Sequence, residues 1–338
     1  MSFRRYIALL LLIVLTLGAF ACNTPDDVED EGSSAPEATD APTEKATKKP
    51  KDTEKSTEPP AVLENVEGLD LDIKLLSQNL YSLDAPNGNS VDERASRFEA
   101  MISELSPDII ATQEGNKDWV GTLKKMKGYA FSGFSSYGEK STGGLWNGIL
   151  YSTERFVLMD AGSFWIGNEV NKPVLAPNAM DKRICSWVEL FDRYTGGSIV
   201  VASAQLDHAS DAVRLTELGQ LTRSLKGNLG KRYNNMPVYL ALDLKCEVDG
   251  DVYYDMIANR GFDDARLLAL KDKSEAMGSN HFFGRAEEGR EECFWFAREY
   301  GEVLSYEVIS SKYKGKNDAE AGFVSDHYGI LLTIGELK

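Results

Sequence analysis

Cysteine is scarce in this chain of 338 residues, which contains four. Cys22 lies near the N-terminus, and the other three, Cys185, Cys246 and Cys293, stand far apart in the sequence. An odd number of widely separated cysteines argues against a disulfide framework or a zinc cage. A single disulfide between two of these three cysteines remains an alternative, but we expect all three to be buried free thiols.

Positive charge is also sparse. The chain has 37 Lys and Arg against 53 Asp and Glu, and its formal net charge is −16. Residues 1–22 contribute +2 and residues 23–61 contribute −6, which leaves −12 for residues 62–338. Such an acidic domain repels phosphate polymers, and no stripe of basic residues with interleaved aromatics is present. Nucleic acid is therefore disfavoured as a partner.

Long apolar runs are missing except for one, over residues 6–17. Two arginines precede it, and small residues ending at Cys22 follow it. The run is too short to span a bilayer comfortably, so the pattern predicts a secretory signal over residues 1–22. The residues before Cys22 resemble a bacterial lipobox, which predicts lipidation of this cysteine. Ordinary signal cleavage near Ala21 is the alternative.

The segment 23–61 consists mainly of Asp, Glu, Lys, Thr, Pro and Ser, with a single large aliphatic residue, Val28. It cannot bury enough apolar surface to offset its ordering entropy, so we expect a disordered stalk. Residues 62–338 are long enough for one large domain. Together these segments predict an extracytoplasmic monomer whose lipid anchor holds it to a bacterial membrane.

Within the domain, helical and strand patterns alternate. Apolar residues recur at helical spacing over residues 91–105, where Pro107 ends the pattern, and again over residues 211–229. A shorter helix is predicted over residues 252–260. Strands are predicted at 71–80, 108–114, 149–151, 183–193, 198–208 and 238–244 and near Phe294, Leu304 and Ile330. Helices mixed with hairpins and buried strands predict an α/β (α+β) sandwich of two packed sheets with helices outside.

The polar segments at the predicted strand ends follow a characteristic order along the chain. They contain, in sequence, Asn79, Gln113-Glu114, Asn147, Phe164-Trp165, Arg183, Gln205-Leu206-Asp207-His208, Leu242-Asp243 and Ser325-Asp326-His327-Tyr328. This order resembles the endonuclease/exonuclease/phosphatase superfamily, which includes deoxyribonuclease I, exonuclease III, sphingomyelinases and inositol polyphosphate 5-phosphatases. The resemblance covers about residues 70–336. It implies a four-layer sandwich of two facing mixed sheets, with the active site where strand ends meet at one edge.

The resemblance also implies metal-assisted hydrolysis of a phosphoester. A carboxylate at the position of Glu114 would hold Mg²⁺ or Mn²⁺, which neutralises charge on the phosphoryl oxygens. The amide of Asn79 would support that metal site. Asp243 would orient or activate the attacking water, His327 stands at the family's essential histidine, and Asp326 can assist it.

Three positions depart from the family pattern. Gln205 stands where the family has a histidine, Lys245 stands where it has an asparagine, and Phe294 is assigned to the aspartate that orients His327. A glutamine donates a hydrogen bond but cannot deliver a proton, and Lys245 can repel a metal ion. On the substrate side, Arg183 and His281 are the candidate binding residues.

Two functions follow from these observations. The first is a metal-dependent phosphoesterase, with weak or altered activity, that acts on a small phosphorylated compound or a lipid head group. The second is a catalytically inactive family member that binds a ligand or a protein partner in the same cleft. The retained carboxylates and His327 favour the first, and the three departures favour the second.

Overall fold

The computed structural model describes residues 60–138, 141, 143–274, 277–286, 289 and 292–337. The predicted signal over residues 1–22, its Cys22, and nearly all of the predicted stalk over residues 23–61 lie outside the described residues. In the part that is described, no helix combines the length and the apolar character that a membrane crossing requires.

Two mixed sheets form the centre of the domain. The first contains seven strands in the spatial order β10 (Lys271–Asp272), β12 (Val303–Ile309), β13 (Gly329–Ile334), β1 (Ile73–Asn79), β2 (Ile109–Gly115), β4 (Trp146–Ser152) and β3 (Tyr129–Ser135). The second contains six, in the order β5 (Phe156–Ile166), β6 (Arg183–Asp192), β7 (Ser198–Gln205), β8 (Val238–Asp243), β11 (Cys293–Arg298) and β9 (Asp263–Asp264). The pairs β1–β2 and β7–β8 are parallel, whereas β1–β13 and β6–β7 are antiparallel.

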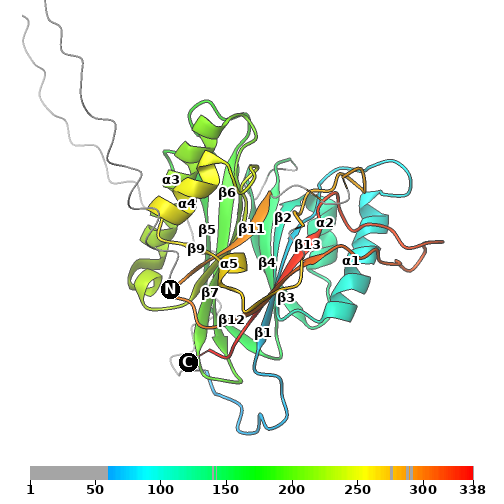
Figure 1. Cartoon of the computed structure of the whole chain (residues 1–338), viewed down its shortest axis with the longest axis vertical. Coiled ribbons are helices and arrows are strands. Elements are labelled where there is room, and N and C mark those ends of the chain that lie inside the picture. Colours follow the sequence, from blue (N-terminus) through cyan, green and yellow to red (C-terminus); the bar gives the residue numbers. More distant parts are fainter. Residues whose placement is uncertain are drawn as a thin grey trace, which may run out of the picture. The chain divides into compact units, whose positions relative to one another are not determined.

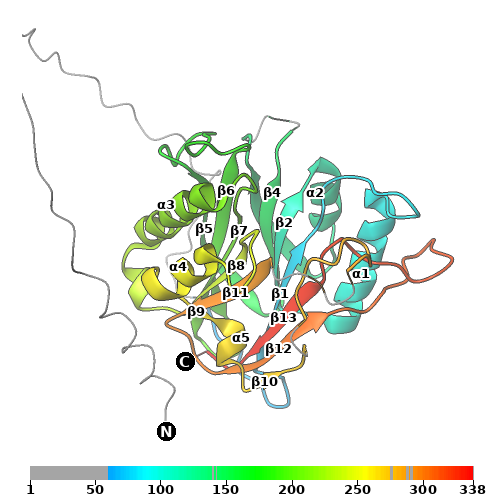
Figure 2. The ribbon, with the colours of Figure 1, turned by 45° about the horizontal axis from the view of Figure 1, so that its top comes forward.

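Helices cover the outer faces of both sheets (Figures 1 and 2). They are α1 (Val91–Leu105), α2 (Lys117–Leu123), α3 (Asp211–Leu229) and α4 (Asp251–Asn259), with a 3₁₀ turn (Gly230–Asn234) after α3. The short α5 (Ala265–Leu268) instead packs against β11 and β12, one strand of each sheet. One apolar cluster fills the space between the sheets, a second lies beneath α3 and α4, and a third lies beneath α1 and α2. The predicted four-layer sandwich is therefore confirmed.

Helix α1 shows how the sequence builds the support for the site. The Ser90 hydroxyl accepts from the Glu93 backbone N–H, and the Glu93 carboxylate accepts from the Ser90 backbone N–H, which is a capping box. The helix ends at Ser106, whose φ of 48° lies in the left-handed region, directly before Pro107. From α1, the buried guanidinium of Arg94 donates to the backbone carbonyls of residues 80, 81 and 83. These bonds hold the loop that follows β1.

Candidate active site

Polar residues end neighbouring strands of both sheets at one edge of the sandwich. Asn79 is the last residue of β1, and Glu114 is next to last in the parallel strand β2. In the second sheet, Gln205 ends β7 and pairs with Asp243, which ends the parallel strand β8. Carboxyl ends of parallel strands lie at the same edge of a sheet. The two sheets thus bring together four side chains that the sequence analysis singled out.

Hydrogen bonds join these side chains across the two sheets. Asn79 Nδ2 donates to Asp243 Oδ2 at 2.8 Å. Gln205 Nε2 donates to the same oxygen at 3.0 Å and also to Glu114 Oε1. Gln205 therefore bridges the two carboxylates as a hydrogen-bond donor.

The ammonium group of Lys245 lies among the carboxylates. Its Nζ is 2.8 Å from Asp243 Oδ2, 3.2 Å from Glu114 Oε1 and 3.8 Å from Glu292 Oε2. Burial raises the pKa of Glu114, but Lys245 and His327 outweigh it and lower this pKa to about 2. Burial lowers the pKa of Lys245, yet Asp243 and Glu114 raise it well above its ordinary value. Glu114 and Lys245 therefore both stay charged at neutral pH.

His327 lies between two further carboxylates. Its Nδ1 is 2.7 Å from Asp326 Oδ1, and its Nε2 is 3.4 Å from Glu292 Oε2. Burial lowers the pKa of His327, but Asp326 and Glu292 raise it more, to about 9. The ring is therefore an imidazolium at neutral pH, with one ring nitrogen hydrogen-bonded to Asp326 and the other within ion-pair distance of Glu292.

Glu292 is a site residue that the sequence analysis missed. Its Oε2 also accepts a hydrogen bond from Asn280 Nδ2 at 2.8 Å. Burial raises its pKa, but His327 and Lys245 lower it to about 2. The sequence did contain a signal for it, because Glu292 stands directly before the apolar strand β11. Glu114 has the corresponding position after the apolar part of β2.

Phe294 does not take the place of an acid that orients His327, so this assignment is corrected. Its side chain is 2% exposed and belongs to the apolar cluster beneath α4. The ring centroid lies 5.3 Å from that of Tyr253 and 5.5 Å from that of Phe296. Successive side chains of a strand point to opposite faces. Phe294 is thus a core residue on the face of β11 that looks away from the site.

Cys293, one residue earlier, faces the site instead. Its Sγ, a carboxylate oxygen of Asp243 and a ring nitrogen of His327 lie within 4.8 Å of one another. Burial raises the pKa of this thiol well above its ordinary value, so it is a neutral group. Like the other two cysteines of the described part, it is buried and free, as the sequence predicted.

Arg183 reaches the site through Gln205. Its Nη1 donates to Gln205 Oε1 at 2.8 Å, and its Nη2 lies 3.3 Å from Asp207 Oδ2. The side chain is 6% exposed. Arg183 therefore orients the amide that bridges the two carboxylates, whereas the direct contact with substrate expected from the sequence stays a prediction.

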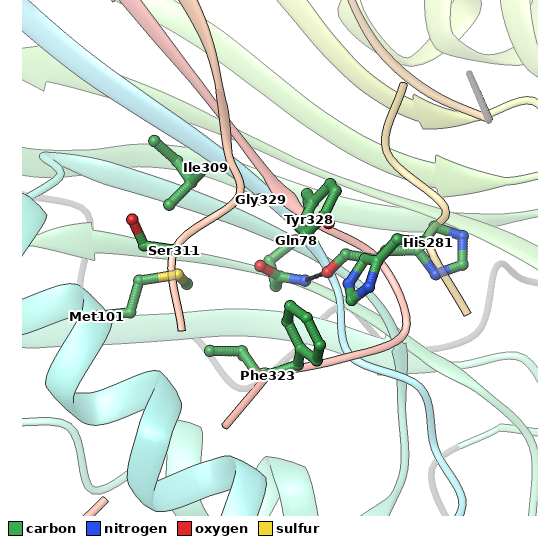
Figure 3. A pocket seen from close by; sticks show the side chains of 10 residues that line it. Gln78, Met101, His281, Ile309, Ser311, Phe323, Tyr328 and Gly329 are labelled. Carbon is green, nitrogen blue, oxygen red and sulfur yellow. Dashed lines mark hydrogen bonds between the residues drawn. The ribbon is translucent and has the colours of Figure 1, made fainter. Parts of the chain in front are cut away.

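His281 lies inside the fold, which corrects its assignment as a substrate-binding residue. It is 1% exposed, and its ring stacks on Tyr328 with centroids 3.8 Å apart. Figure 3 shows His281, Gln78 and Phe323 around a cavity that also touches His327. The cavity measures about 10 Å³, which leaves room for one water molecule at most. His281 therefore stabilises the segment that carries His327.

The metal site expected at Glu114 can be compared with what Mg²⁺ or Mn²⁺ requires. Such an ion needs carboxylate oxygens with free lone pairs at close range. Asp243 Oδ2 already accepts from three donors, the amides of Asn79 and Gln205 and the ammonium of Lys245. Glu114 Oε1 accepts from the last two. In this arrangement Mg²⁺ or Mn²⁺ does not fit between Glu114 Oε1 and Asp243 Oδ2, because a fixed ammonium already neutralises these two oxygens.

A larger hollow lies where the segments after β1 and β2 meet the segment before β6. It measures about 270 Å³, and its wall includes Ser82, Leu83, Asn116, Tyr137 and Asp181. Asn116 follows Glu114 by two residues, and Asp181 precedes Arg183 by two. A hydroxyl, an amide and a carboxylate therefore surround a space large enough for a small polar group.

The two-sheet fold is similar to that of solved endonuclease/exonuclease/phosphatase proteins. A mannosyl-6-phosphatase from Bacteroides thetaiotaomicron is 21% identical over 78% of this chain and 99% of its own, with a TM-score of 0.69. An endonuclease/exonuclease/phosphatase family protein from the same organism is 21% identical over 79% and 99%, with a TM-score of 0.70. The human Nocturnin catalytic domain is 16% identical over 78% and 94%, with a TM-score of 0.58. No protein-family model and no curated protein matches the sequence.

Proposed function

We propose that the protein is a phosphoesterase-like hydrolase that acts on a small phosphorylated compound or a lipid head group. The observation that carries this proposal is the meeting of residues from separate segments at one edge of the sandwich. These residues are Asn79, Glu114, Asp243, Asp326 and His327. The similarity of the fold to that of a mannosyl-6-phosphatase supports the same class of reaction.

The groups of the site can divide the steps of hydrolysis between them. The oxygen of a water molecule bonds to phosphorus while Asp243 takes the proton of that water on Oδ1, the oxygen that does not hold the ammonium. The bond from phosphorus to the leaving alcohol oxygen breaks, and this oxygen takes a proton from the His327 imidazolium. The ammonium of Lys245 supplies positive charge beside the phosphoryl oxygens. No step in this scheme uses a metal ion.

The proposed reaction is slow. Gln205 can hold an oxygen by a hydrogen bond, but it cannot transfer a proton, and general acid or base catalysis contributes about 10²–10⁴ in rate. Its amide is also held by Arg183 on one side and by two carboxylates on the other. Binding and positioning of the substrate by the hollow of about 270 Å³ therefore contribute more to the rate than proton transfer does.

The second candidate is a protein that binds a ligand or a partner in this cleft without chemistry. The observation that favours it is the closed network of ion pairs among Lys245, His327 and the four carboxylates of the site. Every charged group in that network already has a partner of opposite sign.

A hydrolysis assay in EDTA separates the two candidates. The panel contains phosphomonoesters, including sugar phosphates, and phosphodiesters, including lipid head groups. We expect slow hydrolysis of at least one compound by the wild type, with a loss of roughly 100-fold in Asp243→Asn and in His327→Asn. Lys125→Met changes an exposed lysine and serves as the control. Equal rates in all four proteins, with saturable binding of a panel compound, would establish the second candidate.

A further inference from the structure

We propose that the Lys245 ammonium takes the place of a divalent cation between Glu114 and Asp243, so that the site is complete without a metal ion. This inference deepens the proposed function, because it names the cation at the reacting centre. It concerns the binding of metal ions, which is measured separately from hydrolysis.

The geometry around Nζ is that of a cation site. Three carboxylates from three separate segments surround it: Glu114 from the first sheet, Asp243 from the second, and Glu292 from the residues before β11. Carboxylates converging from different elements repel one another unless a cation lies between them. The ammonium is that cation, at 2.8, 3.2 and 3.8 Å from the three oxygens.

Lys245 is held in this position and is not a mobile surface lysine. Its side chain is 16% exposed. Its backbone has a φ of 55°, in the left-handed region, and its backbone N–H donates to Asp243 Oδ1 at 3.2 Å. This tight turn at the end of β8 directs the side chain back over Asp243, where the ammonium contacts the other carboxylate oxygen.

The charges of the site explain why the lysine and a metal ion exclude each other. Glu114, Asp243, Glu292 and Asp326 carry four formal negative charges, and Lys245 and His327 carry two positive ones. An incoming divalent ion would have to share the same oxygens with an ammonium a few ångströms away. Without the lysine charge, these groups have a net formal charge of −3, and this charge strongly attracts a divalent cation.

Thermal unfolding in the presence of metal ions tests the proposal. The wild type, Lys245→Met, Lys245→Met with Glu114→Gln, and Lys125→Met are each titrated with Mg²⁺, Mn²⁺ and Zn²⁺ at constant ionic strength. We expect Lys245→Met to gain a saturable rise in Tm, about 5–10 °C at 100 times the Kd, because the ion binds only the folded state. The double variant should lose this rise. The wild type and Lys125→Met should show only the small, unsaturable response of an acidic domain.

Electron paramagnetic resonance of Mn²⁺ provides a second measurement that needs no lysine variant. We expect no stoichiometric Mn²⁺ on the wild type. One bound Mn²⁺ that Glu114→Gln removes would overturn the proposal, as would a Zn²⁺ rise in wild-type Tm that Cys293→Ser removes. A folded Lys245→Met that gains no metal response would also overturn it, and Lys245→Gln replaces this variant if it does not fold. Absence of hydrolysis with the expected metal results would reject the proposed function alone.

Discussion

At the scale of single residues, the charge of His327 is the property with the clearest consequence. The ring is buried, which disfavours the charged form, but Asp326 and Glu292 stabilise that form more, and the pKa rises to about 9. In the unfolded chain this pKa returns to its ordinary value of 6.5. A group whose pKa is raised by folding stabilises the folded state fully below its unfolded pKa. That contribution is lost as the pH rises through the folded pKa.

We therefore expect the free energy of unfolding to fall between pH 6.5 and pH 9, by about 3 kcal/mol from this residue. Urea unfolding at several pH values, with the wild type compared with His327→Gln, measures the contribution as a difference. Burial raises the pKa of Glu217 to about 7, and its contribution cancels because both proteins contain it. A wild type and a variant that change equally across this range would show that His327 is not held as an imidazolium.

The sequence predicted most residues of the site and misplaced those on one strand. Asn79, Glu114 and Asp243 lie together as expected because each stands at the carboxyl end of a strand with a strong apolar pattern. The segment of Phe294 is apolar on both faces, so its pattern does not show which residues face the site. A shift of one residue moves a side chain to the opposite face of a sheet. The residue of β11 that faces the site is consequently Cys293, and Phe294 is a core residue. The acid beside His327 is Glu292, which lies directly before the strand.

At the scale of elements, the site is made from strand ends with strained backbone. Tyr81, Glu114 and Lys245 have φ values of 52°, 54° and 55°, although none of them is a glycine. Glu114 lies where the pairing of β2 with β4 shifts register, between Thr112 and Gly115. Such conformations have a free-energy cost and persist where the surrounding contacts determine them. The left-handed backbone at Glu114 and at Lys245 directs the two side chains toward each other.

Two neutral substitutions of Lys245 should separate this strain from the loss of charge. Lys245→Asn and Lys245→Thr both remove the ammonium, but asparagine tolerates the left-handed region and a β-branched threonine does not. We expect Lys245→Thr to be less stable than Lys245→Asn by about 1–2 kcal/mol in urea unfolding. The same pair at Lys125, which is exposed and outside the left-handed region, is the control and should differ by much less. Equal stabilities at position 245 would contradict the strained turn.

The strands that the sequence analysis did not identify lack a clear pattern of alternating apolar residues. Strand β3 contains Gly133, which pairs with Gly148 of β4. A Cβ at Gly133 would lie 2.7 Å from the backbone of the partner strand, and a Cβ at Gly148 would lie 2.4 Å from the Phe131 ring. The glycines therefore make room for an aromatic ring, which only the pairing of the strands reveals. Helices 91–105 and 211–229 were predicted because their periodicity is local.

At the scale of the whole molecule, charge determines how the protein can be held at a membrane. Residues 62–338 carry a net charge of −12, and anionic lipid surfaces repel such a domain. We therefore propose that membrane attachment depends on lipidation of Cys22, at the end of the signal-like segment.

Cys22→Ser should accordingly move the protein from the membrane fraction to the soluble extracytoplasmic fraction. We expect the wild type to resist extraction by high salt, because its attachment is not electrostatic, and to be released by detergent, which dissolves the acyl chains. Fractionation followed by immunoblotting measures both. Ala21→Gly, which keeps a small residue before the cysteine, is the matched control and should stay on the membrane. A Cys22→Ser protein that remains attached, or a wild type that high salt removes, would show that another part of the chain makes the contact with the membrane.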